Sequence, residues 1–363
     1  MSVLDIMGFE DFPAVADSLT YESWMKGIAR YLPGSQTLTM VQRGGRQWCR
    51  VAGTDGSPAG YSTARCASVG LNYWDLFTPA QKTLLLTKKV WFGYRYRNNL
   101  IQAGLMNSHA SMYIGPNGFV DLLSSGELAY DTEYFLEFGI DWGNKTVECW
   151  RDGTLMKTVV IPAWSDAQYN TFQLIIGYFT QEYSNSWTTA YGRQFDFTDL
   201  YLLIDDGVGL CNRLGAVKVR PLVPESVVLG EGWDNPTAGN PVDVISQSKM
   251  TVANKLTSVL KTSTSHTDLT VNFKRPVTDD SIEHVVVDIL AFRAEGTITT
   301  VAGKTSLGGA DSTEVVKTPP FTNFGTGLGA IKLLSSDKTP GGQRWTVDAL
   351  DNINVLIAGK TGG

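Results

Sequence analysis

The chain has 363 residues, of which 43% are hydrophobic and 18% charged, and its formal net charge is −6. The composition is typical of a globular protein, and the length predicts two domains, because single hydrophobic cores stop growing near roughly 250 to 300 residues. Scattered lysines and arginines in an acidic chain argue against nucleic-acid binding, and no stretch approaches the ~20 apolar residues that a membrane-spanning helix needs.

The first elements are weakly defined by the sequence. The opening segment, MSVLDIMGFEDF, holds acidic residues and no basic cluster before an apolar run, so we expect no secretory signal. Residues 14–32 predict a short helix, with an irregular cap as the alternative.

The rest of the chain predicts an all-β protein. Thirty-seven glycines, 11% aromatic residues and many Thr and Val residues favour strands joined by tight turns. Between about residues 46 and 205, short strands recur at turn spacings of roughly 8 to 12 residues, which is the pattern of a β-sandwich or jelly roll. The expected strand segments here are 47–53, 88–97, 110–115, 119–123, 134–142, 146–162 and 172–179.

Two features make the strand prediction specific. In residues 90–97 the even positions are Val, Phe or Tyr, whereas the odd positions end in Arg95 and Arg97, which predicts one packed face and one wetter face. The turn residues 143–145 and the dipeptide Asp152-Gly153 predict two successive hairpins. Three consecutive antiparallel strands follow from these turns.

A change in amino-acid composition predicts the domain boundary. Residues 215–241 are rich in Pro and Gly, which interrupt long regular elements, so we place a linker there. Residues 1–214 then hold the N-terminal segment and the jelly-roll domain, and residues 242–363 hold a smaller C-terminal β-sandwich. Its expected strands lie at 268–273, 282–296, 327–334 and 343–359.

Several segments resemble one group of proteins. In order, they are GFEDF (8–12), RGGRQWCRV (43–51), EFGIDWGNKTVECWRDGTLM (137–156), FTDLYLLIDDGVGLCNRLGAVKVRPLVP (197–224) and WTVDALDNINVLIAG (345–359). They are similar to parts of the structural proteins of tailed bacteriophages that carry a concanavalin A-like jelly roll and a C-terminal β-domain. The strongest similarity is at 197–224, where a strand, an acidic turn with Gly and a loop precede a GxVxVxxLxP-like end.

The resemblance implies a concanavalin A-like jelly-roll sandwich, a location in the virion, and contacts with other virion proteins and with copies of the chain itself. Each segment is a loose motif without a catalytic signature, and a fold alone does not fix an activity. The resemblance therefore implies more about fold than about function.

The sequence offers one candidate for glycoside hydrolysis. Asp131, Glu133 and Glu137 have alternating spacing and are expected to face one side of a strand, as paired catalytic carboxylates do. The compact E-x-D-x-x-E pattern of jelly-roll hydrolases is absent, so we interpret the three as charged surface positions. No GxSxG elbow occurs, and His109 and His284 have no partner signature. We therefore predict no catalytic residues and no enzymatic activity.

Metal and cofactor sites are also not expected. The four cysteines, at positions 49, 66, 149 and 211, form no CxxC pair and are interpreted as buried free thiols. Asp199, Asp205 and Asp206 offer oxygen ligands for calcium, but a turn in which an Asp side chain bonds its own backbone explains the last two equally well.

A long polar segment supplies the candidate binding residues. Residues 178–191 crowd aromatic rings among Ser, Thr, Asn and Gln, a mixture that suits stacking on a sugar or docking on a protein. The rings are those of Tyr178, Phe179, Tyr183, Trp187 and Tyr191, and Tyr183 and Trp187 are the pair we would mutate first. An aromatic core is the alternative.

Taken together, the sequence predicts a non-enzymatic bacteriophage virion protein of the tail, collar or capsid surface that acts by protein–protein assembly. The alternative is a carbohydrate-binding adhesin that recognises a host surface glycan. A glycan-cleaving depolymerase is a third, weaker hypothesis.

Overall fold

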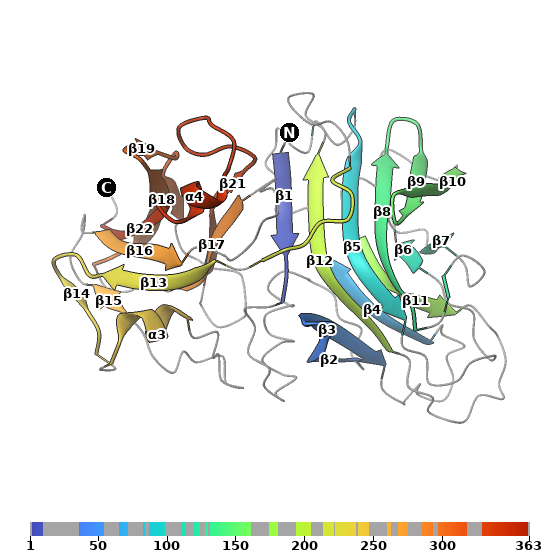
Figure 1. The fold of residues 1–363 in the computed structure, drawn as a ribbon, viewed down its shortest axis with the longest axis horizontal. Coiled ribbons are helices and arrows are strands. Elements are labelled where there is room, and N and C mark those ends of the chain that lie inside the picture. Colours follow the sequence, from blue (N-terminus) through green and yellow to red (C-terminus); the bar gives the residue numbers. More distant parts are fainter. Residues whose placement is uncertain are drawn as a thin grey trace. The chain divides into compact units, whose positions relative to one another are not determined.

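The computed structural model shows two compact units, Met1–Val219 and Arg220–Gly363 (Figure 1). Its described residues are 2–9, 36–53, 65–71, 83, 87–98, 110–113, 119–123, 128–129, 131–160, 174–180, 194–204, 213–220, 222–236, 239–246, 260–262, 268–274, 285–292, 297–317 and 329–361. Most of them lie in antiparallel strands, which confirms the predicted all-β class. No helix of this described part is long and apolar enough to cross a membrane.

The first unit is a β-sandwich of the jelly-roll type, as predicted. Its larger sheet, sheet A, has the strand order β10-β9-β8-β5-β12-β3-β2, with β1 also paired to β12. These strands are β1 (Ser2–Met7), β2 (Gln36–Arg43), β3 (Arg46–Gly53), β5 (Val90–Asn98), β8 (Glu133–Asp141), β9 (Thr146–Arg151), β10 (Thr154–Val160) and β12 (Gln194–Ile204).

The smaller sheet of this unit, sheet B, has the order β4-β11-β6-β7. Its strands are β4 (Arg65–Leu71), β6 (Ala110–Tyr113), β7 (Phe119–Leu123) and β11 (Leu174–Thr180). Sheet B is joined from segments far apart in the chain, since β4 and β11 pair directly along seven positions. Such long-range pairing is typical of jelly rolls and is not visible in local sequence patterns.

Strand β12 organises sheet A because it is shared by three neighbours. It pairs with β5 along most of its length, while its other edge pairs first with β3 and then with β1. Between Thr198 and Tyr201 the register shifts, and Asp199 there has a φ of 51°, so a β-bulge separates the two halves of the strand. The bulge keeps Thr198 and Tyr201 on the same face of the sheet.

The inner face of sheet A is aromatic. Phe92, Tyr94 and Tyr96 of β5 are almost completely buried and pack in tilted or edge-to-face contacts with neighbouring rings, with centroids 5.2 to 6.2 Å apart. These are the even positions that the sequence predicted to pack, so this prediction is confirmed. Burial of large rings supplies most of the stabilisation of such a core.

The second unit is also a sandwich of strands. Its main sheet, sheet C, has the order β13-β16-β22-β18-β19, with β20 also paired to β18, and the pairs β17–β21 and β14–β15 lie outside it. The strands are β13 (Val223–Val228), β14 (Trp233–Asp234), β15 (Lys261–Thr262), β16 (Asp268–Lys274), β17 (Val285–Phe292), β18 (Thr300–Leu307), β19 (Ala310–Asp311), β20 (Val315–Lys317), β21 (Gly329–Ser336) and β22 (Asn354–Lys360). Two short helices, α3 (Pro241–Ser246) and α4 (Val347–Leu350), complete it.

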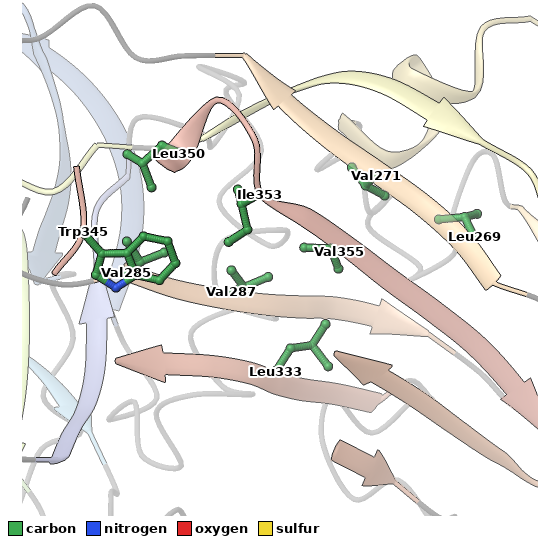
Figure 2. Close-up of a cluster of buried hydrophobic side chains, with 9 residues drawn as sticks. All are labelled: Leu269, Val271, Val285, Val287, Leu333, Trp345, Leu350, Ile353 and Val355. Carbon is green, nitrogen blue, oxygen red and sulfur yellow. The ribbon is translucent and has the colours of Figure 1, made fainter. Parts of the chain in front are cut away.

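One buried cluster holds the second unit together. Figure 2 shows side chains from β16 and β22 facing those from β17 and β21, with Trp345 and Leu350 at one end. Its members are Leu269, Val271, Val285, Val287, Leu333, Trp345, Leu350, Ile353 and Val355. A continuous apolar layer between a large sheet and a strand pair is what makes this segment a compact unit of its own.

The structure differs from the sequence prediction at two places. Strand β13 forms inside the predicted linker 215–241, because Ser226, Val227 and Val228 pair with β16. Helix α4, capped by the Thr346 hydroxyl, interrupts the predicted strand segment 343–359. The helix predicted at residues 14–32 lies outside the described residues.

Candidate functional site

The outer face of sheet A, which points away from its aromatic core, carries most of the charged side chains described in the first unit. It divides into a polar half, beside β2 and β3, and an apolar half beside β1. The polar half holds five arginines and four carboxylates: Arg43, Arg46, Arg50, Arg95, Arg97, Asp131, Glu133, Asp196 and Asp199. Strand register places these groups opposite one another, which is why they pair.

Asp196 is the centre of the polar half. It lies opposite Arg50 on β3 and Arg97 on β5 and is completely buried. Its two oxygens accept hydrogen bonds from Arg50 at 2.8 and 3.0 Å, and Arg43 approaches at 3.0 Å. This bidentate pairing raises the pKa of Arg50. Burial, together with the Asp196 charge, raises the pKa of the Cys49 thiol well above its ordinary value.

Asp199 occupies the β-bulge of β12. One carboxylate oxygen pairs with Arg46 at 2.6 Å and Arg95 at 3.0 Å, and the other accepts the Val219 amide at 3.0 Å. The carboxylate is therefore surrounded by donors, in a geometry unlike a calcium site built from several oxygens. No group of three or more His, Cys, Asp or Glu residues in the described ranges is arranged to hold a metal ion. Asp205 and Asp206 lie outside those ranges.

Glu137 on β8 is buried on the apolar half. Its Oε1 accepts hydrogen bonds from the Tyr201 hydroxyl at 2.6 Å and from the Gly215 amide at 2.8 Å. Its Oε2 pairs with Arg213 at 2.7 Å, and that guanidinium also lies 4.2 Å from the centroid of the Trp150 ring. Burial and the nearby Glu137 charge raise the pKa of Tyr201 well above its ordinary value.

The hydrolase candidate can now be judged from geometry. Glu133 and Glu137 do share one face, with Phe135 between them, as the spacing predicted. Glu137 is not a surface position, however, because it is 0% exposed and each of its oxygens has a donor. Asp131 and Glu133 stay exposed and pair with Arg97 at 2.9 Å and Arg95 at 2.7 Å. A general acid or base must reach a substrate proton, and the buried Glu137 faces no solvent.

The apolar half is covered by the segment that leaves the unit. Residues Arg213–Val219, here called the strap, lie over a cluster of Trp91, Phe135, Tyr201 and Leu203 (in Figure 1 the strap belongs to the yellow trace that leads to β13). Leu214 and Val217 are the strap side chains that pack on this cluster. The sequence prediction of a wetter face is therefore correct for Arg95 and Arg97 and wrong for Trp91, which is only 5% exposed.

Glycine makes this close packing possible. A Cβ atom at Gly93 would lie 2.2 Å from Cε1 of Tyr201, and one at Gly139 would lie 2.8 Å from the Trp91 ring. Both rings therefore lie directly over the backbone of β5 or β8. The requirement comes from the packing of distant residues, so the sequence alone did not reveal it.

The predicted binding residues are only partly placed by the structure. Tyr178 lies in β11 of sheet B, where it pairs with Ala67 of β4. Tyr183, Trp187 and Tyr191 lie outside the described residues, so the binding surface that they were predicted to form stays a prediction. His109 and His284 also lie outside the described residues, whereas Cys49 and Cys149 are buried free thiols, as expected.

Sequence analysis missed the buried ion pairs of Asp196, Asp199 and Glu137. For the two aspartates a signal did exist, because the segment Phe195–Tyr201 puts them among mostly apolar residues of a core strand. A buried carboxylate needs a cationic partner, and the arginines at 43, 46 and 50 supply it here.

The sequence matches no protein-family model and no curated protein. Solved structures do match the chain. A β-glucanase catalytic domain of glycoside hydrolase family 131 from Podospora anserina is 15% identical, with 55% of this chain and 96% of that one covered and a TM-score of 0.34. An alginate lyase is 11% identical, with 54% and 95% covered and a TM-score of 0.35. A sialidase is 9% identical, with a TM-score of 0.30, and the match spans 48% of this chain and only 17% of the sialidase.

These matches correct one prediction, namely that the chain is not an enzyme. The matched structures include a β-glucanase catalytic domain and an alginate lyase, so the absence of enzymatic activity does not follow for this chain. None of the matches tests a place in a bacteriophage virion, which stays a prediction. At these identities and TM-scores the matches show nothing finer, and the jelly-roll sandwich is shown by the strand pairing of the structure itself.

Proposed function

We propose that the first unit binds carbohydrate, and that the glycan lies over sheet B and the aromatic segment 178–191, which begins at the end of β11. The observation that carries this proposal is the closure of the opposite side of the sandwich. On the outer face of sheet A the strap covers the apolar half, and the carboxylates of the polar half are already paired with arginines. A sugar hydroxyl would have to displace these charge-assisted bonds in order to bind there.

The composition of the segment after β11 supports the same side. Strand β11 leads directly into residues with aromatic rings, hydroxyls and amides, which are the groups that stack on sugar rings and bond their hydroxyls. Two of the solved structures named above are a β-glucanase domain and an alginate lyase, so β-glucan and alginate are the polysaccharides with which to begin.

Titration of the chain with β-glucan and alginate oligosaccharides tests the proposal, with tryptophan fluorescence and calorimetry as readouts. The double variant Tyr183→Ala/Trp187→Ala should lose at least about tenfold in affinity, because each stacked ring contributes on the order of 1 kcal/mol or more. The matched control is Asp131→Asn, which alters the outer face of sheet A. Unchanged binding by the double variant, or equal loss in the control, would remove this site. Incubation with the same polymers, followed by reducing-sugar and unsaturated-uronate assays, would show whether binding leads to cleavage.

A second candidate is a structural component of a bacteriophage particle that binds other virion proteins and copies of itself. Besides the sequence resemblance, one structural observation favours it. The exposed large hydrophobic residues of the described part are Leu155, Val160, Val223, Val228 and Val316, and they lie on β10, β13 and β20. Strands β10 and β13 end the strand orders of their sheets, and unpaired strand edges with apolar side chains favour pairing with another chain.

Quantitative mass spectrometry of gradient-purified particles from the source tests this second candidate. Tens of copies or fewer per particle would support a tail or collar component, and hundreds would support head decoration. Absence from the particles would remove the virion proposal and leave the glycan-binding one. A chain that binds glycan and is also present in particles would fit an adhesin that recognises a host surface glycan.

A further inference from the structure

The strap connects the first unit to the second, and its contacts are concentrated on two buried carboxylates. Glu137 holds its beginning through Arg213 and the Gly215 amide, and Asp199 holds its end through the Val219 amide. The Leu214 amide, also at the beginning, donates to the Tyr201 hydroxyl at 3.2 Å, and the Val217 carbonyl in between accepts a hydrogen bond from Arg95 at 3.4 Å. The strap is thus fastened at both ends to β8 and β12 of sheet A.

When the strap detaches, both buried carboxylates keep hydrogen-bond partners within sheet A. Asp199 still has Arg46 and Arg95, and Glu137 still has Tyr201. Every strap-derived donor on these carboxylates can be replaced by water once the face is open. The sheet therefore does not depend on the strap to keep its strands paired, since no ladder bond of β8 or β12 involves residues 213–219.

The strap itself is held by few apolar contacts. Leu214 and Val217 pack on the cluster of sheet A and are only partly buried, and Gly215 between them has a φ of 77° with no atom within 4 Å of the place of a Cβ. Segments with few buried apolar contacts open at a lower free energy than the strands beneath them. The contacts are specific enough to dock the strap and too few to make it part of the core.

We propose that Arg213–Val219 is a latched strap that opens as one piece while sheet A stays folded, and that it stores chain length for the second unit. Glu137 and Asp199 are the two points of the latch. Full release of the seven residues gives the second unit up to about 25 Å of extra chain, at roughly 3.3 to 3.6 Å per residue. The open state also exposes the rings of Trp150 and Tyr201.

Hydrogen exchange of the full-length chain, followed by mass spectrometry, tests the proposal. The peptide covering residues 213–219 should exchange more slowly than an unprotected peptide but well before the peptides of β8 and β12. Glu137→Gln removes the charge that holds Arg213 and the Gly215 amide, and it should speed exchange of the whole strap by about tenfold or more. The strap should still exchange well before β12, although β12 also loses protection because the variant lowers the stability of the first unit. Asp131→Asn is the matched control, since Asp131 pairs on the same face without touching the strap.

Two results would overturn the proposal. One is strap exchange as slow as that of β12, which means that the strap opens only when the unit unfolds. The other is strap exchange that Glu137→Gln leaves unchanged. Should Glu137→Gln fail to fold, Leu214→Ser alters no residue of sheet A and should give the same acceleration of the strap. Pulling on both ends of the chain should then show a step of about 25 Å or less before either unit unfolds, and its absence contradicts the stored length.

Discussion

Removal of one oxygen atom, the Tyr201 hydroxyl, tests how much the buried hydrogen-bond network on the outer face of sheet A stabilises the first unit. The hydroxyl donates to Glu137 at 2.6 Å and accepts the Leu214 amide at 3.2 Å, and the ring is 0% exposed. Tyr201→Phe keeps the ring and leaves no large cavity. A hydrogen bond to a charged group contributes ~1.5–3 kcal/mol, and an unpaired, half-buried amide adds up to ~1 kcal/mol. We therefore expect the free energy of unfolding of the first unit to fall by about 2–4 kcal/mol.

The cysteines provide an assay for the first unit alone. All four lie before residue 220, and Cys49 and Cys149 are buried. Pulsed thiol labelling across a urea gradient therefore reports the unfolding of this unit, and the midpoint should move down by about 1–2 M for a slope near 2 kcal/mol/M. Tyr134→Phe is the control, because its hydroxyl accepts the Ala129 amide in an exposed position. Equal small shifts, below ~0.5 kcal/mol in both variants, would refute the assigned role of the buried network.

Four further outcomes follow from the packing and the charges. Gly93→Ala places a Cβ 2.2 Å from a buried ring, so the first unit should lose about 1–3 kcal/mol in the labelling assay. Asp196→Asn leaves the guanidinium groups of Arg43 and Arg50 without their buried partner, so the first unit should lose about 3 kcal/mol of unfolding free energy. Asp131→Asn should cost less than ~1 kcal/mol, because the Asp131 side chain is 50% exposed. Burial raises the pKa of the Cys49 thiol above its ordinary value of 9.0. The neutral thiol therefore contributes fully to the stability of the first unit below pH 9, and this contribution is lost as the pH rises above that value. Equal urea midpoints at pH 8 and pH 10.5 would contradict this expectation. Leu333→Ala should lower the stability of the second unit by about 2–4 kcal/mol in a fluorescence-detected melt and leave thiol labelling unchanged.

Local patterns predicted the parts of this fold that are governed by local physics. The alternation in β5 and the Asp152-Gly153 turn between β9 and β10 are both present, because side-chain period and turn conformation depend on neighbouring residues. Strand β13 was hidden inside a Pro- and Gly-rich stretch, since its pairing partner β16 lies far along the chain. The hydrogen bond from Asn272 to Ser226, for example, joins residues that are 46 positions apart. A strand that is defined by a distant partner leaves little trace in its own composition.

The site was harder to predict, for a related reason. Glu137 has the spacing of a catalytic carboxylate, and what distinguishes it is Arg213, which is 76 residues later in the chain. Asp199 belongs to a β-bulge whose partners are contributed by β3, β5 and the strap. Ion pairs of this kind depend on the register between strands, and register is not readable from one strand at a time.

The pairing of the carboxylates also bears on where activity, if present, must reside. A catalytic carboxylate needs an open side toward substrate and a proton that moves during the reaction. Asp196 and Glu137 are fully buried and each is bound by at least one arginine, and Asp199 accepts bonds from two. Their removal should therefore change the stability of the first unit far more than any chemistry. A cleavage activity that survives in a folded Asp196→Asn variant would place the reacting groups elsewhere, and sheet B is the remaining broad surface of the sandwich. Loss of cleavage with full stability retained would instead bring the reaction back to sheet A.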